Sequence, residues 1–246
     1  MTYYPKLNGE LCYLSPVDPQ DYSLFVPWVN DLESSLGMIF LSSVIGEQKE
    51  REIMERIAQG VNFAIVDNKL VPAAIALDPN LMVGLPPKVT AATGMDALTH
   101  SIEAFISPLS SPVNDLIALE SIRLVATHLQ RAVQAGDDLE ARAGMSLAAT
   151  LGGIAINNAD VAGVHCLSEG MGGLYDAPHG LLNAVLLPYF MAYWQAGCPE
   201  HFSRIAQAFG ARATPEEAVF HVTHLARAMK FPSLREIGVR EADLPK

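Results

Sequence analysis

The feature that most restricts the fold is a long succession of helical patterns after Pro87. In each segment, apolar residues recur every three to four positions and the segment ends near Gly, Pro or Asn. His165 and Glu169, which stand four residues apart, indicate one further interior helix. The other predicted helices cover residues 93–107, 111–136, 138–159, 178–197, 201–210 and 214–231. Because no stretch after residue 77 has a convincing strand pattern, the sequence predicts a mostly α-helical C-terminal domain.

The front of the chain has a different pattern. Residues 11–17 alternate like a half-buried strand and residues 62–67 form a short apolar run typical of a second strand. Residues 19–31 and 46–60 have helical spacing. We expect residues 78–87, which contain three prolines, to lack regular structure. The predicted fold class is therefore α+β, with a short α/β segment at residues 1–69 and a mostly helical domain at residues 70–246.

Charge and composition exclude several kinds of partner. The formal net charge is −11 and there is no cluster of Lys or Arg, so we expect neither nucleic-acid binding nor attraction to an anionic membrane. No apolar run is long enough to span a bilayer, and the N-terminus lacks the pattern of a signal peptide. The three cysteines match neither a disulfide framework nor a CxxC zinc motif. These features predict a protein of the reducing cytoplasm.

Four residues, Asp96, His100, His165 and His179, are candidates for a metal site. Asp96 and His100 stand four apart on a helix that we expect Thr93 to cap, so both side chains project from one face. His165 and Glu169 have the same spacing, and His179 follows Pro178 at a predicted helix start. One carboxylate and three imidazoles form a ligand set suited to Fe(II) or Zn(II).

Either pair by itself is more often structural than metal-binding. A single interior His is usually a hydrogen-bonded core residue, and an Asp four residues before a His arises often by chance. Spacing alone leaves both interpretations open. Four other histidines lack such partners and are interpreted as surface or structural residues: His128, His201, His221 and His224.

Two long motifs connect the separated candidates. The sequence TGMDALTHSIEAFIS at 93–107 is followed by NNADVAGVHCLSEGMGGLYDAPHGLLNAVLLP at 157–188. Because these motifs occur in the order and at the spacing that the iron-containing alcohol dehydrogenase family has, residues from about 71 to 246 resemble that family. The resemblance implies a C-terminal helical domain of the dehydroquinate-synthase-like kind. It also implies an Fe(II) or Zn(II) ion, an NAD(P) cofactor bound beside a Rossmann-like domain, a small alcohol or aldehyde substrate, and a homo-oligomer. Carried over by position, it makes the metal ligands Asp96, His100, His165 and His179.

Glu169 departs from the pattern of the family. Many members have a further His at this position, associated with proton relay. A carboxylate here can act as the catalytic proton shuttle or as an additional ligand. It can equally be a polar residue that lines a wet cleft. We carry Glu169 forward as the candidate catalytic residue.

The phosphate-binding turn of a dinucleotide domain is not recognisable. The chain contains no GxGxxG, and the GMGG at 170–173 is interpreted as helix termination and close packing. We also expect the C-terminus, at DLPK, to stop short of the last helices of the family.

The front segment has a resemblance of its own. Residues 1–69 resemble the opening of GNAT-type N-acetyltransferases of the ribosomal-protein-acetylating kind, but without their acetyl-CoA turn. Three hypotheses follow: a metal-dependent NAD(P) oxidoreductase, a non-catalytic metal-binding fusion product, and an acetyltransferase fragment.

Overall fold

The computed structural model describes residues 7–8, 12–16, 63–67 and 77–240. The chain divides into two compact units, Met1–Leu77 and Asp78–Lys246. The predicted boundary between residues 69 and 70 lies outside the described residues.

The described part of the first unit is a three-stranded antiparallel sheet. The strands are β1 (Leu7–Asn8), β2 (Cys12–Pro16) and β3 (Phe63–Asp67), in that order across the sheet. Along β2 and β3 the register pairs Leu14 with Ile65. The two predicted strands are therefore confirmed, whereas β1 was not predicted. The predicted helices at 19–31 and 46–60 lie outside the described residues.

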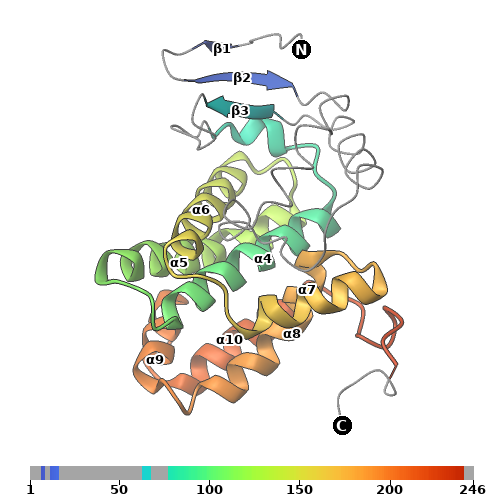
Figure 1. The fold of residues 1–246 in the computed structure, drawn as a ribbon. Helices are drawn as coiled ribbons and strands as arrows, with labels where there is room; N and C mark the ends of the chain where they lie inside the picture. Colours follow the sequence, from blue (N-terminus) through green and yellow to red (C-terminus); the bar gives the residue numbers. More distant parts are fainter. Residues whose placement is uncertain (1–6, 9–11, 17–62, 68–76, 241–246) are drawn as a thin grey trace. The chain divides into compact units, whose positions relative to one another are not determined.

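The second unit is helical throughout its regular structure, as the sequence predicts (Figure 1). A short 3-10 helix, η2, precedes seven α-helices within residues 77–240. Their bounds are η2 Pro79–Met82, α4 Pro87–Ile106, α5 Pro112–Gln134, α6 Leu139–Asn157, α7 Gly163–Tyr175, α8 His179–Trp194, α9 Pro199–Ala208 and α10 Pro215–Ala228. None of the described helices is both long and apolar enough to cross a bilayer.

Helix starts follow local capping chemistry. The side chains of Ser111, Asp138 and Thr214 accept backbone N–H bonds at the starts of α5, α6 and α10. Such caps satisfy N–H groups that have no partner within their own helix. Sequence patterns therefore locate most helix starts to within one or two residues.

The expectation of irregular structure up to Pro87 was wrong. Pro79 begins η2, and α4 begins at Pro87 rather than at a Thr93 cap. Proline suits the first position of a helix because its missing N–H would have no helical partner there. Thr93 lies inside α4, where its hydroxyl donates to the carbonyl oxygen of Val89.

We had expected the GMGG segment at residues 170–173 to end a helix, but it does not. Helix α7 continues through it to Tyr175 and ends where Asp176 adopts a left-handed conformation, with φ of 50°. A Cβ added at Gly170 or Gly173 would meet no atom within 4 Å, so neither glycine marks a close contact.

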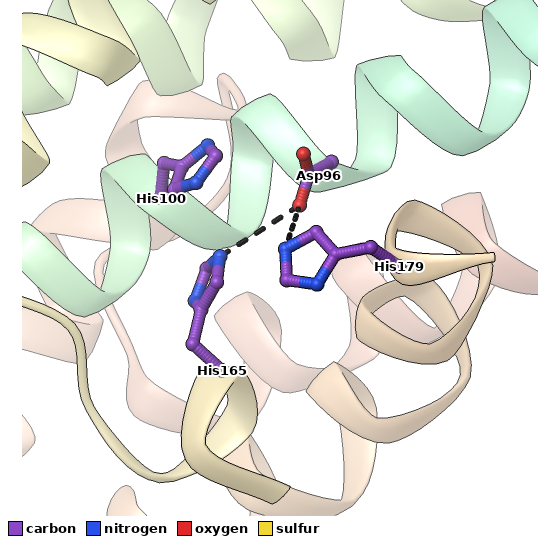
Figure 2. A group of neighbouring side chains, drawn as sticks. All are labelled: Asp96, His100, His165 and His179. Carbon is purple, nitrogen blue, oxygen red and sulfur yellow. Dashed lines mark ion pairs between the residues drawn. The ribbon is translucent and has the colours of Figure 1, made fainter. Parts of the chain in front are cut away.

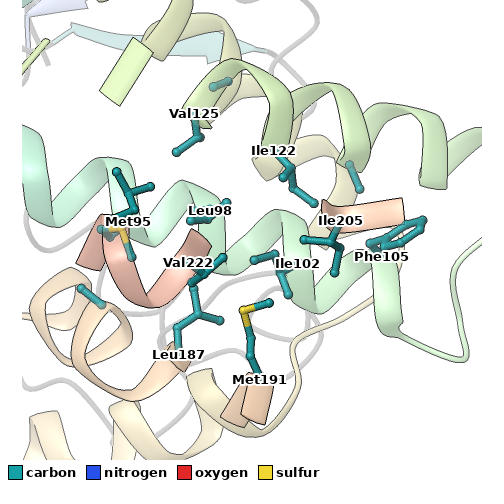
Figure 3. Packing of buried hydrophobic residues seen from close by; sticks show 14 of the residues in the cluster. Met95, Leu98, Ile102, Phe105, Ile122, Val125, Leu187, Met191, Ile205 and Val222 are labelled. Carbon is teal, nitrogen blue, oxygen red and sulfur yellow. The ribbon is translucent and has the colours of Figure 1, made fainter. Parts of the chain in front are cut away.

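Helix α4 lies in the middle of the apolar core. Figure 3 shows Met95, Leu98, Ile102 and Phe105 of α4 among residues from α5, α8, α9 and α10. The four α4 side chains are fully buried. Burying such side chains stabilises a fold by about 1.5–3 kcal/mol each. The core therefore holds α4 firmly, and α4 presents Asp96, His100 and Glu103 to α7 and α8.

Candidate metal centre

The four predicted ligands come together from three helices. Asp96 and His100 lie one turn apart on α4, His165 lies in the first turn of α7, and His179 is the first residue of α8. One ligand atom from each lies within 4.8 Å of every other. Figure 2 shows the rings of His165 and His179 close to the Asp96 carboxylate, with His100 beside them. The structure therefore brings the four predicted residues into one group.

Asp96 is at the centre of this group. Its Oδ1 lies 3.5 Å from Nε2 of His179 and 3.7 Å from Nε2 of His165. The rings of His100 and His165 stack, with centroids 4.5 Å apart. Asn183, one turn after His179, donates its amide N–H to Asp96 Oδ1 at 2.6 Å and lies 2.9 Å from Nε2 of His179. These distances bring one carboxylate and three imidazoles around a common point.

Two of the imidazoles have nitrogens without a hydrogen-bond partner among the described residues. These atoms, Nε2 of His100 and Nε2 of His165, are both buried. Leaving a buried polar atom unsatisfied costs about 1–3 kcal/mol. A divalent cation fits this environment because neutral imidazole nitrogens and a carboxylate are its preferred ligands. The donor set is therefore suited to an ion.

Burial differs between the two sides of the group. The His165 side chain is fully buried, whereas those of Asp96 and His179 remain 22 % and 31 % exposed. The group is thus closed on the His165 side and accessible beside Asp96 and His179.

Within the metal-free group, burial and neighbouring charges shift the pKa values of the candidate ligands in different directions. Burial raises the pKa of Asp96, but contact with His165 and the nearby His100 and His179 outweigh it and lower that pKa to about 2. Burial lowers the pKa of His100 to about 4. Burial also lowers the pKa of His165, but Asp96 and Glu103 outweigh it and raise that pKa to about 9. Asp96 is therefore ionised at neutral pH, and His100 is neutral.

Glu103 is a functional candidate that the sequence analysis missed. It is fully buried on α4, and its Oε2 lies 2.5 Å from Nδ1 of His165. Its position three residues after His100 and seven after Asp96 was an available signal, because this spacing places all three on one face of a helix. Asn183 was missed as well, and its signal was the four-residue spacing from His179.

Glu169, the candidate catalytic residue, does not belong to the group of four. It is partly exposed on α7, one turn after His165. Burial raises the pKa of its carboxyl, and the carboxyls of Glu103 and Asp160 act in the same direction. Two of the histidines that we interpreted as surface or structural residues have partners outside the group. His201 packs edge-on against Phe105, and His221 contacts Glu217.

Comparison with known proteins agrees with this helical fold. Residues 90–246 match the C-terminal part of the Fe-containing alcohol dehydrogenase family. The chain belongs to this family.

Several characterised relatives are similar to the chain. It is 45 % identical to 1,3-propanediol dehydrogenase of Klebsiella pneumoniae, over 75 % of this chain and 50 % of that protein. It is 40 % identical to alcohol dehydrogenase 4 of Saccharomyces cerevisiae, over 86 % of this chain and 57 % of that protein. The crystal structure of a 1,3-propanediol oxidoreductase matches with a TM-score of 0.66 and 45 % identity, over 68 % of this chain and 46 % of that one. The chain therefore spans about half the length of these relatives.

The similarity begins earlier than residue 71. The match to the yeast protein covers 86 % of the chain. The part left outside the match is shorter than segment 1–69, so the match includes some of that segment. Part of that segment thus resembles alcohol dehydrogenases. No comparison given above supports the predicted resemblance to acetyltransferases.

Proposed function

We propose that the chain provides the metal centre of an alcohol or aldehyde oxidoreductase that uses NAD(P). The observation that carries the proposal is the group Asp96, His100, His165 and His179, whose ligand atoms lie within 4.8 Å of one another. Two of its buried imidazole nitrogens have no other partner in the described part of the chain. The similarity to 1,3-propanediol dehydrogenase and alcohol dehydrogenase 4 favours a small alcohol or aldehyde as the substrate.

The four residues would hold Fe(II) or Zn(II). A divalent ion at this position supplies Lewis-acid polarisation of an alcohol or aldehyde oxygen. Asp96 contributes one negative charge to the ligand set, and the imidazoles contribute none when neutral. The set therefore leaves a divalent ion with residual positive charge, which favours an anionic oxygen of the substrate.

The rest of the arrangement directs access and proton movement. Because the side chains of Asp96 and His179 are partly exposed, the substrate oxygen enters beside them. The buried side chain of His165 excludes water from the opposite side. We assign proton relay to Glu169. Its raised carboxyl pKa favours exchange of a proton closer to neutral pH than an ordinary glutamate permits.

The hydride acceptor in the proposal is NAD(P). The sequence has no GxGxxG turn to receive its pyrophosphate, so nucleotide binding needs a test separate from metal binding.

The test combines three measurements on the purified chain. Elemental analysis should find close to one Fe or Zn per chain, a titration should quench or enhance NAD(P)H fluorescence saturably, and 1,3-propanediol should be oxidised. His179→Ala should lose the metal, whereas His224→Ala, which changes an exposed histidine on α10, should retain it.

Two results would contradict the proposal in different ways. Metal binding without nucleotide binding or turnover would leave a non-catalytic metal-binding module. Equal metal content in the His179→Ala and His224→Ala variants would refute the ligand assignment itself.

A further inference from the structure

Glu103 lies where a single side chain can act on both α4 and α7. It follows Asp96 by seven residues and His100 by three, so α4 presents two candidate ligands and this carboxylate from one face. The Glu103 side chain is fully buried. A buried carboxylate is rarely tolerated unless it is fully hydrogen-bonded.

The partners of Glu103 are all at the start of α7. Its Oε1 accepts the backbone N–H of Val164 at 2.7 Å, and its Oε2 accepts that of Ala162 at 3.1 Å. Ala162 is the N-cap residue of α7, and no side-chain cap is formed there. Glu103 therefore supplies, from another helix, the capping oxygens that the sequence of α7 lacks.

The same carboxylate fixes the ring of His165. Nδ1 of His165 lies 2.5 Å from Oε2 of Glu103. Because Oε2 already accepts the backbone N–H of Ala162, we assign it as the acceptor of this contact as well, which places the proton on Nδ1. In a neutral imidazole the lone pair then belongs to Nε2, the buried atom with no hydrogen-bond partner that faces Asp96. A carboxylate in this relation to a metal-binding histidine sets its tautomer and ring orientation.

We propose that Glu103 is the positioning residue of the metal centre: it caps α7 and holds His165 with Nε2 presented to the ion. The inference rests on the proposed metal site. It explains why His165 can be correctly oriented at the beginning of a helix that has no cap of its own.

The test is the dissociation constant of Zn²⁺ for the 246-residue chain, measured by competition with a chromophoric chelator. Glu103→Gln keeps the shape of the side chain but replaces an acceptor oxygen by an amide donor. We expect Zn²⁺ affinity to fall by about 10- to 100-fold, the range found when partners of metal ligands are changed. Glu200→Gln, which changes an exposed glutamate on α9, is the matched control and should bind Zn²⁺ like the original chain.

A double-mutant cycle separates positioning from general stabilisation. If Glu103 acts through His165, then Glu103→Gln should weaken Zn²⁺ binding little or not at all in a chain that already carries His165→Ala. A loss of equal size in both backgrounds would overturn the inference. Circular dichroism of each metal-free variant verifies folding, and Glu103→Asp, which retains the charge on a shorter side chain, replaces Glu103→Gln if that variant does not fold.

The outcomes distinguish the two proposals. Zn²⁺ binding by the original chain together with unchanged affinity in Glu103→Gln would refute the role of Glu103 and leave the metal site intact. Failure of the original chain to bind Zn²⁺ would refute the metal site, and the positioning role with it.

Discussion

Gly180 is the residue at which a single added methyl group should disturb the metal centre most directly. It follows His179 in the first turn of α8, where α8 approaches α4. A Cβ at this position would lie 2.7 Å from the carbonyl oxygen of Ala92 and 3.0 Å from its carbonyl carbon. Both atoms belong to the backbone of α4, so no side chain can rotate away to make room.

The displacement follows from these distances. An unstrained contact needs about 3.5 Å, so the first turn of α8 must move by roughly 0.8 Å. Metal–ligand distances tolerate deviations of only about 0.2 Å. We therefore expect Gly180→Ala to weaken Zn²⁺ binding by about 10-fold or more and to lower the free energy of unfolding by about 1–3 kcal/mol, the usual cost of overpacking.

The assay pairs Zn²⁺ competition with urea unfolding, and Gly173→Ala is the control. Gly173 lies in α7, and an added Cβ there would meet no atom within 4 Å. Replacing a helical glycine by alanine should raise the free energy of unfolding by about 0.5–1 kcal/mol and leave Zn²⁺ affinity unchanged. If Gly180→Ala binds Zn²⁺ as tightly as the original chain, the close approach of α8 to α4 does not set the position of His179.

Three further predictions concern stability. Gly152→Ala should lower the free energy of unfolding by about 1–3 kcal/mol, because its Cβ would lie 2.9 Å from Ser101 Oγ, whereas Gly153→Ala, with open space, should raise it slightly in urea unfolding. In the metal-free chain, the pKa of His100 is about 4 in the folded state, so between pH 4 and 6.5 unfolding takes up a proton and stability falls as the pH falls. The pKa of His165 is about 9 in the folded state, so between pH 6.5 and 9 unfolding releases a proton and stability falls as the pH rises. Stability should therefore decline on both sides of about pH 6.5, and a flat urea-midpoint profile would contradict this. Zn²⁺ at about 100 times its dissociation constant should add about 2.7 kcal/mol to the free energy of unfolding, and a chelator should reverse the change.

The helices were largely predictable because their signals are local. Apolar periodicity located α4, α5, α6, α8, α9 and α10, and the spacing of His165 and Glu169 indicated α7, but the 3-10 helix η2 was missed. The start of α4 was missed because the prolines before Thr93 were treated as helix breakers, although Pro87 occupies a favourable first position. Local patterns thus predicted the helices. The error at α4 arose because proline interrupts the interior of a helix but favours its start.

The candidate site was predictable only in part. The i, i+4 pairs gave Asp96 and His100, but only the family resemblance joined them to His165 and His179. Glu103 was missed because its partners, the N–H groups of Ala162 and Val164, are about 60 residues away in the chain. Backbone donors have no signature in a sequence, so contacts of this kind emerge only from the packed helices.

The placement of the ligands on either side of α5 and α6 also affects the topology of the chain. His100 and His165 are separated by the whole α5–α6 pair, so an ion bound to both would close a large covalent loop. A cross-link of this kind reduces the entropy of the unfolded chain, and the reduction grows with the length of the loop it closes. An ion at this position would therefore act as a reversible, chelator-sensitive counterpart of a disulfide, in a chain in which Cys166 and Cys198 are free thiols.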